Sequence, residues 1–260
     1  INAKVKFGDY KLGFFRDFPN LTFSLENLSV VGIDKFENDT LAASKSLNLV
    51  FNLSSLFKKS GYEIKSVLIN EADINTIVLD DGSTNWDIMA DTTESDSPDE
   101  SSSAMKILLQ KVKIENSSVS YLDKESTIEA FLDGVNCSLN GDLTGSITNL
   151  EIIINAEELT FVMDGLKYLN RAKADSKINV TANLDSMKFN LRDNYLKIND
   201  LKLNFAGMVA MPEDDIETAL SFNSEESTFK SLLSLIPAFY MNDFKDLKAE
   251  GTFNLAGTAK

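Results

Sequence analysis

The chain has 260 residues, of which 40 are acidic and 25 basic, giving a net charge of −15. This charge opposes binding to nucleic acid and to anionic membrane surfaces, so we expect no nucleic-acid partner. Histidine is absent and cysteine occurs once, which excludes an intrachain disulfide, a His/Cys metal site and a nucleophile–histidine pair.

The N-terminal part predicts strands with one apolar face. Residues 1–20 fit either a strand or a short helix. The segment Thr22–Val31 alternates apolar and polar residues, and Asn27 interrupts the alternation as a bulge would. The segment Ser46–Leu53 places Leu47, Leu49 and Phe51 on one side and polar residues on the other. This pattern is typical of a half-buried antiparallel strand.

A short crossover helix is predicted near residues 54–60. Serines begin the segment, lysines occupy its last turn and Gly61 follows it, as is usual at helix ends. Strands resume at Tyr62–Ile69 and Asp73–Leu79. Residues 80–83, Asp-Asp-Gly-Ser, then predict a tight turn, because glycine adopts positive φ without strain.

An acidic linker is predicted between two β-rich units. Residues 91–103 lack apolar side chains and contain five acids and one proline, a composition typical of disordered segments. We therefore expect one unit over 1–90 and a second over 104–260, continuous with the first.

A weak internal repeat links the two units. The segment Val112–Leu122 can be laid on Val67–Ile77 with an offset of 45 residues and no gap. In both, an apolar pair, a polar break and another apolar pair follow one another, and Leu196–Phe205 has the same form. The repeated unit is predicted to be a strand with a kink.

Most of the chain from Ile128 to Val209 alternates apolar residues with Asn, Ser, Thr, Lys and Asp. Such a sheet has one wet and one apolar face, which excludes the two-sided burial of a parallel α/β sheet. An amphipathic helix is predicted over Ser224–Tyr240, capped by Ser224. Its apolar residues Phe229, Leu232, Leu233 and Ile236 should dock on an apolar surface.

No catalytic, metal or cofactor site is predicted. The chain contains no glycine-rich phosphate loop, and acidic pairs such as Asp80 with Asp81 are uninformative among 40 acids. Cys137 is expected to be a small buried hydrophobe. The single tryptophan, Trp86, is expected to plug the end of a hairpin. The alternative is a stacking platform for a sugar or lipid headgroup, with Tyr62 as the only nearby aromatic residue with a polar tip.

Several segments resemble the AsmA family of envelope proteins. They are FPNLTFSLENLSVVG, LAASKSLNLVFNLSSLFKK, the strand I-x-x-V-x-I-N-E-A-x-I, and the turn that contains Gly82, Asn85, Trp86 and Asp87. The C-terminal segment Phe229–Gly257 also resembles that family, in which an LIPA-type helix precedes a G-x-F-x-L-x-G strand. The order of these elements is more specific than any one of them.

The resemblance implies a non-enzymatic protein on the periplasmic side of a Gram-negative inner membrane. It also implies a long, curved, groove-like sheet related to bridge-like lipid-transfer proteins, and a role in outer-membrane biogenesis or lipid homeostasis. The chain opens at Ile1 without an initiator methionine, so we expect the membrane anchor in a segment that this chain lacks.

The fold class expected is therefore mainly β, with an extended, curved antiparallel sheet and few helices. Lipid or acyl chains are the expected ligands of its apolar face. The alternatives are a scaffold with a closed core and no ligand, and a surface carbohydrate-binding β-protein. The candidate groove residues are Leu47, Leu49, Phe51, Leu150, Ile152, Ile154, Phe189, Leu191, Leu203 and Phe205.

Overall fold

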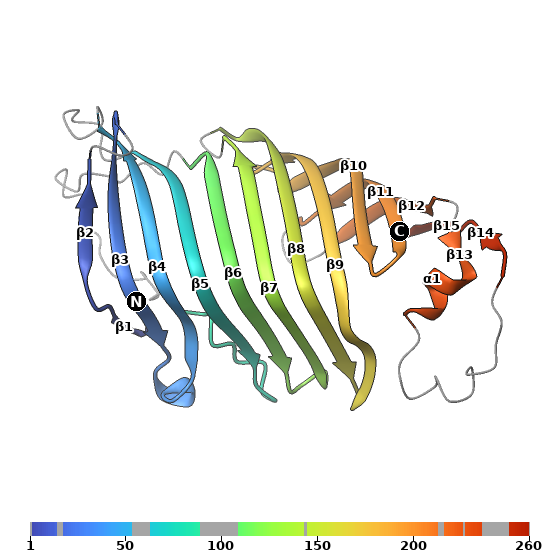
Figure 1. Ribbon diagram of the computed structural model, residues 1–260, viewed down its shortest axis with the longest axis horizontal. Coiled ribbons are helices and arrows are strands. Elements are labelled where there is room, and N and C mark those ends of the chain that lie inside the picture. The colour runs from blue at the N-terminus through green and yellow to red at the C-terminus, as the bar shows by residue number, and fades with distance from the viewer. Residues whose placement is uncertain are drawn as a thin grey trace.

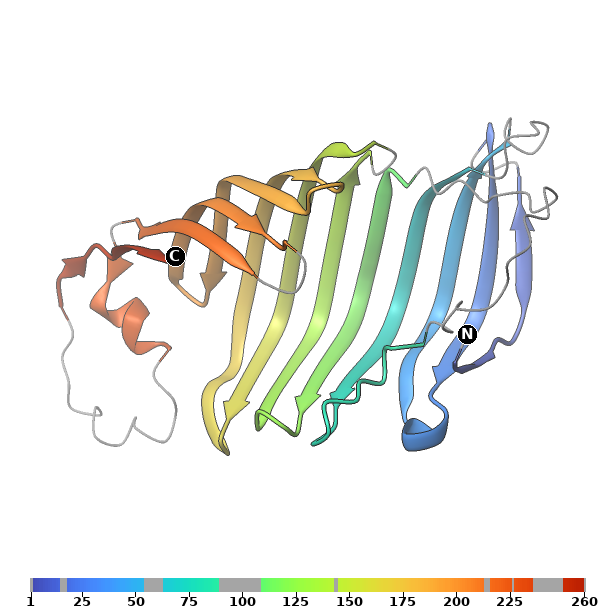
Figure 2. The same cartoon turned by 180° about the vertical axis from the view of Figure 1, so that it is seen from behind.

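The computed structural model describes residues 2–14, 18–53, 63–88, 109–142, 145–212, 216–225, 227–235 and 250–259. One thirteen-stranded sheet dominates it (Figures 1 and 2). Its strands are β1 (Lys4–Lys6), β2 (Tyr10–Gly13), β3 (Asn20–Val31), β4 (Thr40–Asn52), β5 (Ile64–Val78), β6 (Lys111–Asp123), β7 (Ile128–Gly141), β8 (Ile147–Met163), β9 (Leu166–Asn183), β10 (Lys188–Ile198), β11 (Leu201–Ala210), β12 (Glu217–Ser224) and β15 (Ala256–Ala259).

The strands follow one another across the sheet nearly in chain order, β1-β3-β4-β5-β6-β7-β8-β9-β10-β11-β12-β15, and β2 also pairs with β3. Antiparallel pairing of sequence neighbours therefore builds an open sheet with two free edges. Strands β10 to β12 turn out of the plane of the earlier strands, as the two opposite views make clear. The expectation of an extended, curved, mainly antiparallel sheet is confirmed.

The one parallel pair joins the two halves of the sheet. Strands β5 and β6 pair with Val67 opposite Val112 and Ile74 opposite Val119, which is the 45-residue offset of the sequence repeat. Equivalent residues of the repeat thus lie side by side, and the apolar positions of one strand continue into the next. The third instance differs, because Ile198 and Leu201 face each other across the turn between β10 and β11.

A row of irregular residues crosses the middle of the sheet. Each has a positive φ within a strand, although only one is a glycine: Asn27, Glu71, Asn116, Gly134 and Arg171. A left-handed residue other than glycine costs roughly 1–2 kcal/mol, so the surrounding pairing must hold it in place. We call these residues the kink row. Strand β10 also has a residue with positive φ, Asp193, but it lies off this row, because Asn194 beside it accepts from the N–H of Asn179, well away from Arg171 along β9. What looks in the sequence like a break between two strands at Asn70–Asp73 is a kink inside the single strand β5.

The kink row changes which sequence positions are apolar without changing the face on which they lie. In β5 the apolar-face positions are 67 and 69 before Glu71, and 72 and 74 after it. The same one-residue shift in β6 separates Val112 and Ile114 from Val119. Because β5 and β6 remain in register across the kink, the apolar rows continue from strand to strand.

Side chains replace backbone hydrogen bonds that the kinks disrupt. The backbone N–H of Ala72 donates to Ser117 Oγ at 3.0 Å, and the Ser117 hydroxyl donates to the carbonyl of Glu115 at 2.9 Å. Similarly, Asn116 N–H donates to Asn136 Oδ1 at 3.2 Å. Buried backbone donors are thereby satisfied next to strained residues.

Ser117→Ala should lower the free energy of unfolding by about 1–3 kcal/mol, because it leaves the Ala72 N–H buried without an acceptor. Ser117 is only 2% exposed, so water cannot easily substitute. The measurement is the midpoint of urea unfolding. The control is Ser118→Ala, which removes an exposed hydrogen bond to Asp73 and should change the midpoint little. Equal effects of the two substitutions would contradict the role of Ser117 at the kink.

The predicted C-terminal helix is shorter than expected. Helix α1 comprises Phe229–Leu233, and Thr228 rather than Ser224 caps it by accepting a hydrogen bond from the Ser231 N–H. Ser224 instead ends β12, where its Oγ accepts from the Leu255 N–H at 2.7 Å.

Helix α1 lies beyond the C-terminal end of the main sheet, beside the small pair β13 (Ser227–Thr228) and β14 (Thr252–Phe253) (Figure 1). Phe229 and Leu232 are 43% and 40% exposed, and the Phe229 ring lies against that of Phe253 with centroids 5.4 Å apart, so the expected docking of the apolar helix face is only partial. Ile236, the predicted crossover helix at 54–60 and the acidic linker at 91–103 lie outside the described residues.

Candidate functional site

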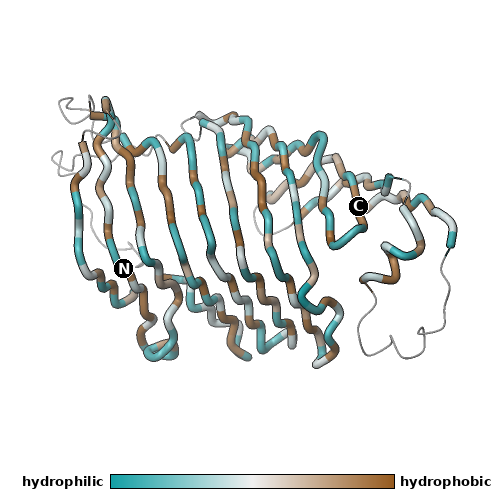
Figure 3. The backbone as a smooth tube through the Cα atoms, in the orientation of Figure 1, coloured by the Kyte–Doolittle hydropathy of each residue, from teal (hydrophilic) through white to brown (hydrophobic). Residues whose placement is uncertain are grey.

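One face of the sheet carries continuous rows of apolar side chains. Residues directly opposite each other on paired strands share a face, so the pairing register identifies each row. The hydropathy tube shows the alternation along the strands from which these rows are built (Figure 3). One row, from β3 to β9, consists of Phe23, Leu49, Val67, Val112, Leu139, Ile152 and Ile178.

A neighbouring row of the same half lies closer to the kinks and consists of Leu25, Leu47, Ile69, Ile114, Cys137 and Ile154. Beyond the kinks another row consists of Val30, Ala42, Ile74, Val119, Leu132, Leu159 and Ala172. The kink row therefore divides the apolar face into two parts. The rows of the apolar face run across the strands rather than along them.

The candidate groove residues all lie on this apolar face and are all half-buried. Leu49 and Ile152 share one row, Leu47 and Ile154 share the next, and Leu150 pairs through Val180 with Leu191. On the later strands Phe189 is opposite Val209, Leu203 is opposite Leu196, and Phe205 is opposite Phe222. Phe51 pairs with Leu21 near the upper end of β4.

The apolar face is the more crowded of the two faces. Ala72, Val135, Ala156 and Ala172, which adjoin the kink row, are all at most 5% exposed. Close contacts among the described elements join neighbouring strands of the sheet, and those of α1 are with β13. Because no described element covers these side chains, their burial comes from neighbours in the same sheet.

The opposite, polar face satisfies its own hydrogen bonds. Ser24 donates to Asn48 at 2.6 Å, Asn155 donates to Asp175 at 2.7 Å, and Ser120 donates to Asn75 at 2.7 Å. These cross-strand pairs leave the polar face hydrated and internally bonded. The difference between the two faces makes the apolar face the candidate site.

Cys137 lies on the apolar face, between Ile114 and Ile154 in their row. It is half-buried rather than fully buried, and burial raises the pKa of its thiol. The sequence contains no second cysteine, so Cys137 is a unique chemical reporter on this face.

The plug at the end of β5 is Asn85, not Trp86. Asn85 is 2% exposed; its Oδ1 accepts from the Ile77 N–H at 2.9 Å and its Nδ2 donates to the Asn75 carbonyl at 2.7 Å. The turn before it forms as predicted, with Gly82 at a φ of 74°. The amide of Asn85 thus takes the place of a neighbouring strand along the edge of β5.

Trp86 is 42% exposed, and its ring centroid lies 6.4 Å from that of Tyr121. The sequence argument missed Tyr121 because this residue is distant in the chain and enters through the parallel pairing of β5 and β6. Tyr62 lies outside the described residues. The Tyr121 hydroxyl donates to Asp123 at 3.0 Å, which raises the pKa of the phenol.

Asn85→Ala should lower the free energy of unfolding by about 2–4 kcal/mol, because two buried backbone groups of β5 lose their partners. Trp86→Ala should cost less, since Trp86 is 42% exposed and its removal leaves no buried backbone group of β5 without a partner. Urea unfolding of the two variants distinguishes them. A larger loss of unfolding free energy for Trp86→Ala would show that Trp86, and not Asn85, is the plug.

Among the residues that the structure describes, the titratable groups show no arrangement suited to catalysis. Asp81 lies in the turn, where the Lys35 ammonium at 2.5 Å and Ser83 hold the pKa of its carboxyl below the ordinary value. Within the described ranges, no group of three His, Cys, Asp or Glu residues could hold a metal ion. The described helices include none that is long and apolar enough to span a membrane.

A family model described as the AsmA family matches residues 8–235. No curated protein matches the chain. No solved structure matches it either.

Proposed function

The chain belongs to the AsmA family, and on this basis we propose that its apolar face binds lipid acyl chains and conducts them along the sheet. AsmA proteins are envelope proteins and generally non-enzymatic, and the open sheet is consistent with a lipid-transfer domain of this family. The proposed setting is the periplasmic side of an inner membrane, in outer-membrane biogenesis. The observation that carries the proposal is the set of uninterrupted apolar rows.

The dimensions of the apolar face suit acyl chains. The ten consecutive strands β3 to β12 are neighbours in the sheet, and at about 4.8 Å per strand they extend roughly 43 Å. The hydrocarbon core of a bilayer, which two acyl chains span, is roughly 30 Å thick. An extended chain lying along the rows would therefore remain on apolar side chains throughout.

Large apolar side chains that a closed domain would bury are left partly exposed on this face, which favours binding of an apolar ligand. The fully buried hydrophobic residues of the described part are mostly small, and the larger Leu49, Ile152 and Phe205 are only half-buried. Covering such a surface with acyl chains stabilises the complex by roughly 0.8 kcal/mol per buried methylene. The kink row crosses the strands, and a bound acyl chain would lie parallel to it.

Binding can be tested through Cys137. Protein purified without detergent should release lipid into organic extracts, as detected by mass spectrometry. After delipidation, added oleate should slow maleimide labelling of Cys137 at a fixed pH, because the chain covers its row. An extract free of lipid, together with an unchanged labelling rate, would contradict the proposal.

A scaffold with a closed core was the first alternative, and it predicts a sandwich or a helix-covered sheet. The described elements form neither. The second alternative, carbohydrate binding, has one supporting observation, the exposed Trp86 beside Tyr121. A glycan array with wild type and Trp86→Ala tests it, and binding that the substitution abolishes would favour it.

A further inference from the structure

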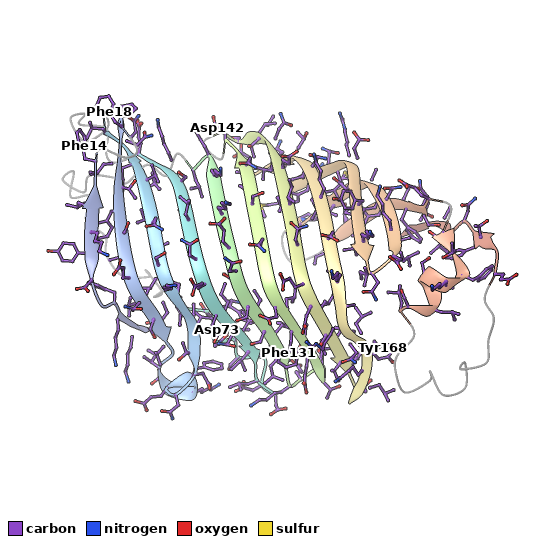
Figure 4. The ribbon with its side chains drawn as sticks, viewed as in Figure 1. Phe14, Phe18, Asp73, Phe131, Asp142 and Tyr168 are labelled. Carbon is purple, nitrogen blue, oxygen red and sulfur yellow. The ribbon has the colours of Figure 1, made fainter. Side chains whose placement is uncertain are left out.

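The upper edge of the sheet carries an unusual set of exposed apolar residues at the ends of β8 to β12. They lie in or beside the connecting segments rather than in the middle of strands. Their exposures are 67% for Ile147, 38% for Leu184, 41% for Met187, 40% for Met211 and 70% for Ile216. We call these residues the tip row. In Figure 4, Asp142, which follows β7, marks the same edge.

The backbone brings the members of the tip row together in space. The Leu184 N–H donates to the Ser146 carbonyl at 2.7 Å, beside Ile147, and the Met211 N–H donates to the Met187 carbonyl at 3.0 Å. Ile216 precedes Glu217, which pairs with Ala210 next to Met211. The tip row is therefore a continuous line along one edge.

The opposite edge also has exposed apolar residues, with Trp86, Leu166 and Tyr168 at 42%, 41% and 39%, but none of these reaches the 67% and 70% of Ile147 and Ile216. The residues of the turns themselves differ more clearly. The turns of the opposite edge, at 80–83, 124–127, 164–165 and 199–200, consist of Asp, Lys, Glu, Ser, Thr, Asn and Gly, the residues that turns normally use. The backbone geometry of a turn does not favour the apolar residues found in the connections of the upper edge. An exposed apolar patch in this position indicates a contact with another apolar phase.

We infer that the tip row inserts into the surface of an electrically neutral or zwitterionic lipid bilayer. The last row of the apolar face, Thr148, Ala182, Phe189, Val209 and Thr218, lies immediately inside the tips. Tips inserted in a leaflet would bring that row close to the acyl chains of the bilayer.

Charge favours this occupant over an anionic membrane. The chain carries a net charge of −15, and the tip segments 142–147, 184–188 and 211–217 contain six acids against one lysine, Lys188. Anionic headgroups would be repelled overall. A narrow line of flexible aliphatic side chains, including two methionines, also resembles a membrane-insertion edge more than the broad packed patch of a protein interface.

The test is flotation of the full chain with vesicles of phosphatidylcholine. Wild type should float, and the double variant Ile147→Ser/Ile216→Ser should show at least a tenfold lower partition coefficient. Both residues are at least 67% exposed, so folding should be unaffected. Phe131→Ser, a matched substitution of a 45% exposed apolar residue on the polar face, should float like wild type.

Three results would overturn the inference: no flotation of wild type, equal flotation of the double variant, or flotation that requires anionic lipid. A protein partner for the tip row would give the first of these. The test is independent of the apolar face, because Ile152→Glu should lose acyl-chain binding and still float.

Discussion

Ile152→Glu is expected to weaken oleate binding at least 100-fold, or about 2.8 kcal/mol. Ile152 lies between Leu139 and Ile178 in the row that runs from β3 to β9. A carboxylate there would lie beneath the bound chain without a cationic partner in its row. Burying an unpaired charge costs several kcal/mol. The carboxylate must therefore become protonated or the oleate must dissociate. Titration with a fluorescent fatty acid measures the change.

The next residue provides a matched control. Ile153 is also half-buried, but it faces the polar side, where it is opposite Ser138 and Lys177. Ile153→Glu introduces the same charge into the same strand beside a lysine, and oleate binding should stay within about twofold of wild type. Equal losses in both variants would indicate damage to the fold, and intact binding by Ile152→Glu would remove the apolar face as the site.

The faces of the strands were predictable because alternation is a local property. Leu47, Leu49 and Phe51 each point to the same side for the same reason, and no knowledge of the neighbouring strand is needed. Their alignment with Ile152 or Ile154 could not be predicted, because register depends on pairing between distant segments. The 45-residue repeat was the one sequence signal of register, and the parallel pairing of β5 and β6 has this offset.

The repeat predicted a kinked strand, which is what β5 is, but the separate strands predicted at Tyr62–Ile69 and Asp73–Leu79 are parts of this single strand. Asn70–Asp73 has the composition of a turn, and a turn and a left-handed residue within a strand favour similar residue types. The difference lies in the neighbours, since Ser117 on β6 satisfies the Ala72 N–H that a kink would leave unpaired. That partner is 45 residues away.

The prediction that Trp86 is the plug, where the structure has Asn85, failed for a related reason. Size and rarity suggested that tryptophan fills the end of the sheet. The edge of β5 instead presents a backbone N–H and a carbonyl, and an asparagine amide matches both. Polar requirements of a strand edge outweigh apolar volume at this position. The helix was overpredicted for the complementary reason, because Ser224 is needed to bond Leu255 in the sheet.

Gly207→Ala is expected to detach β12 and β15 from the sheet, at a cost of about 3 kcal/mol or more. Gly207 has a φ of 143°, and a Cβ on it would lie 2.1 Å from the Ala219 carbonyl oxygen on β12. The obstacle is backbone, so a side-chain rotation cannot relieve it. Hydrogen exchange should show lost protection in β12 and β15.

The damage should stay local, because each strand contacts chiefly its immediate neighbours and the sheet resembles a repeat array in its cooperativity. Peptides from β4 to β8 should retain wild-type exchange. Gly165→Ala is the control: Gly165 has a φ of 72° but no atom within 4 Å of the added Cβ, so the cost is backbone strain of about 1–2 kcal/mol. If Gly207→Ala instead exposed β4 to β8 as well, the sheet would unfold as one unit. In that case its apolar rows would depend on the whole sheet rather than on neighbouring strands.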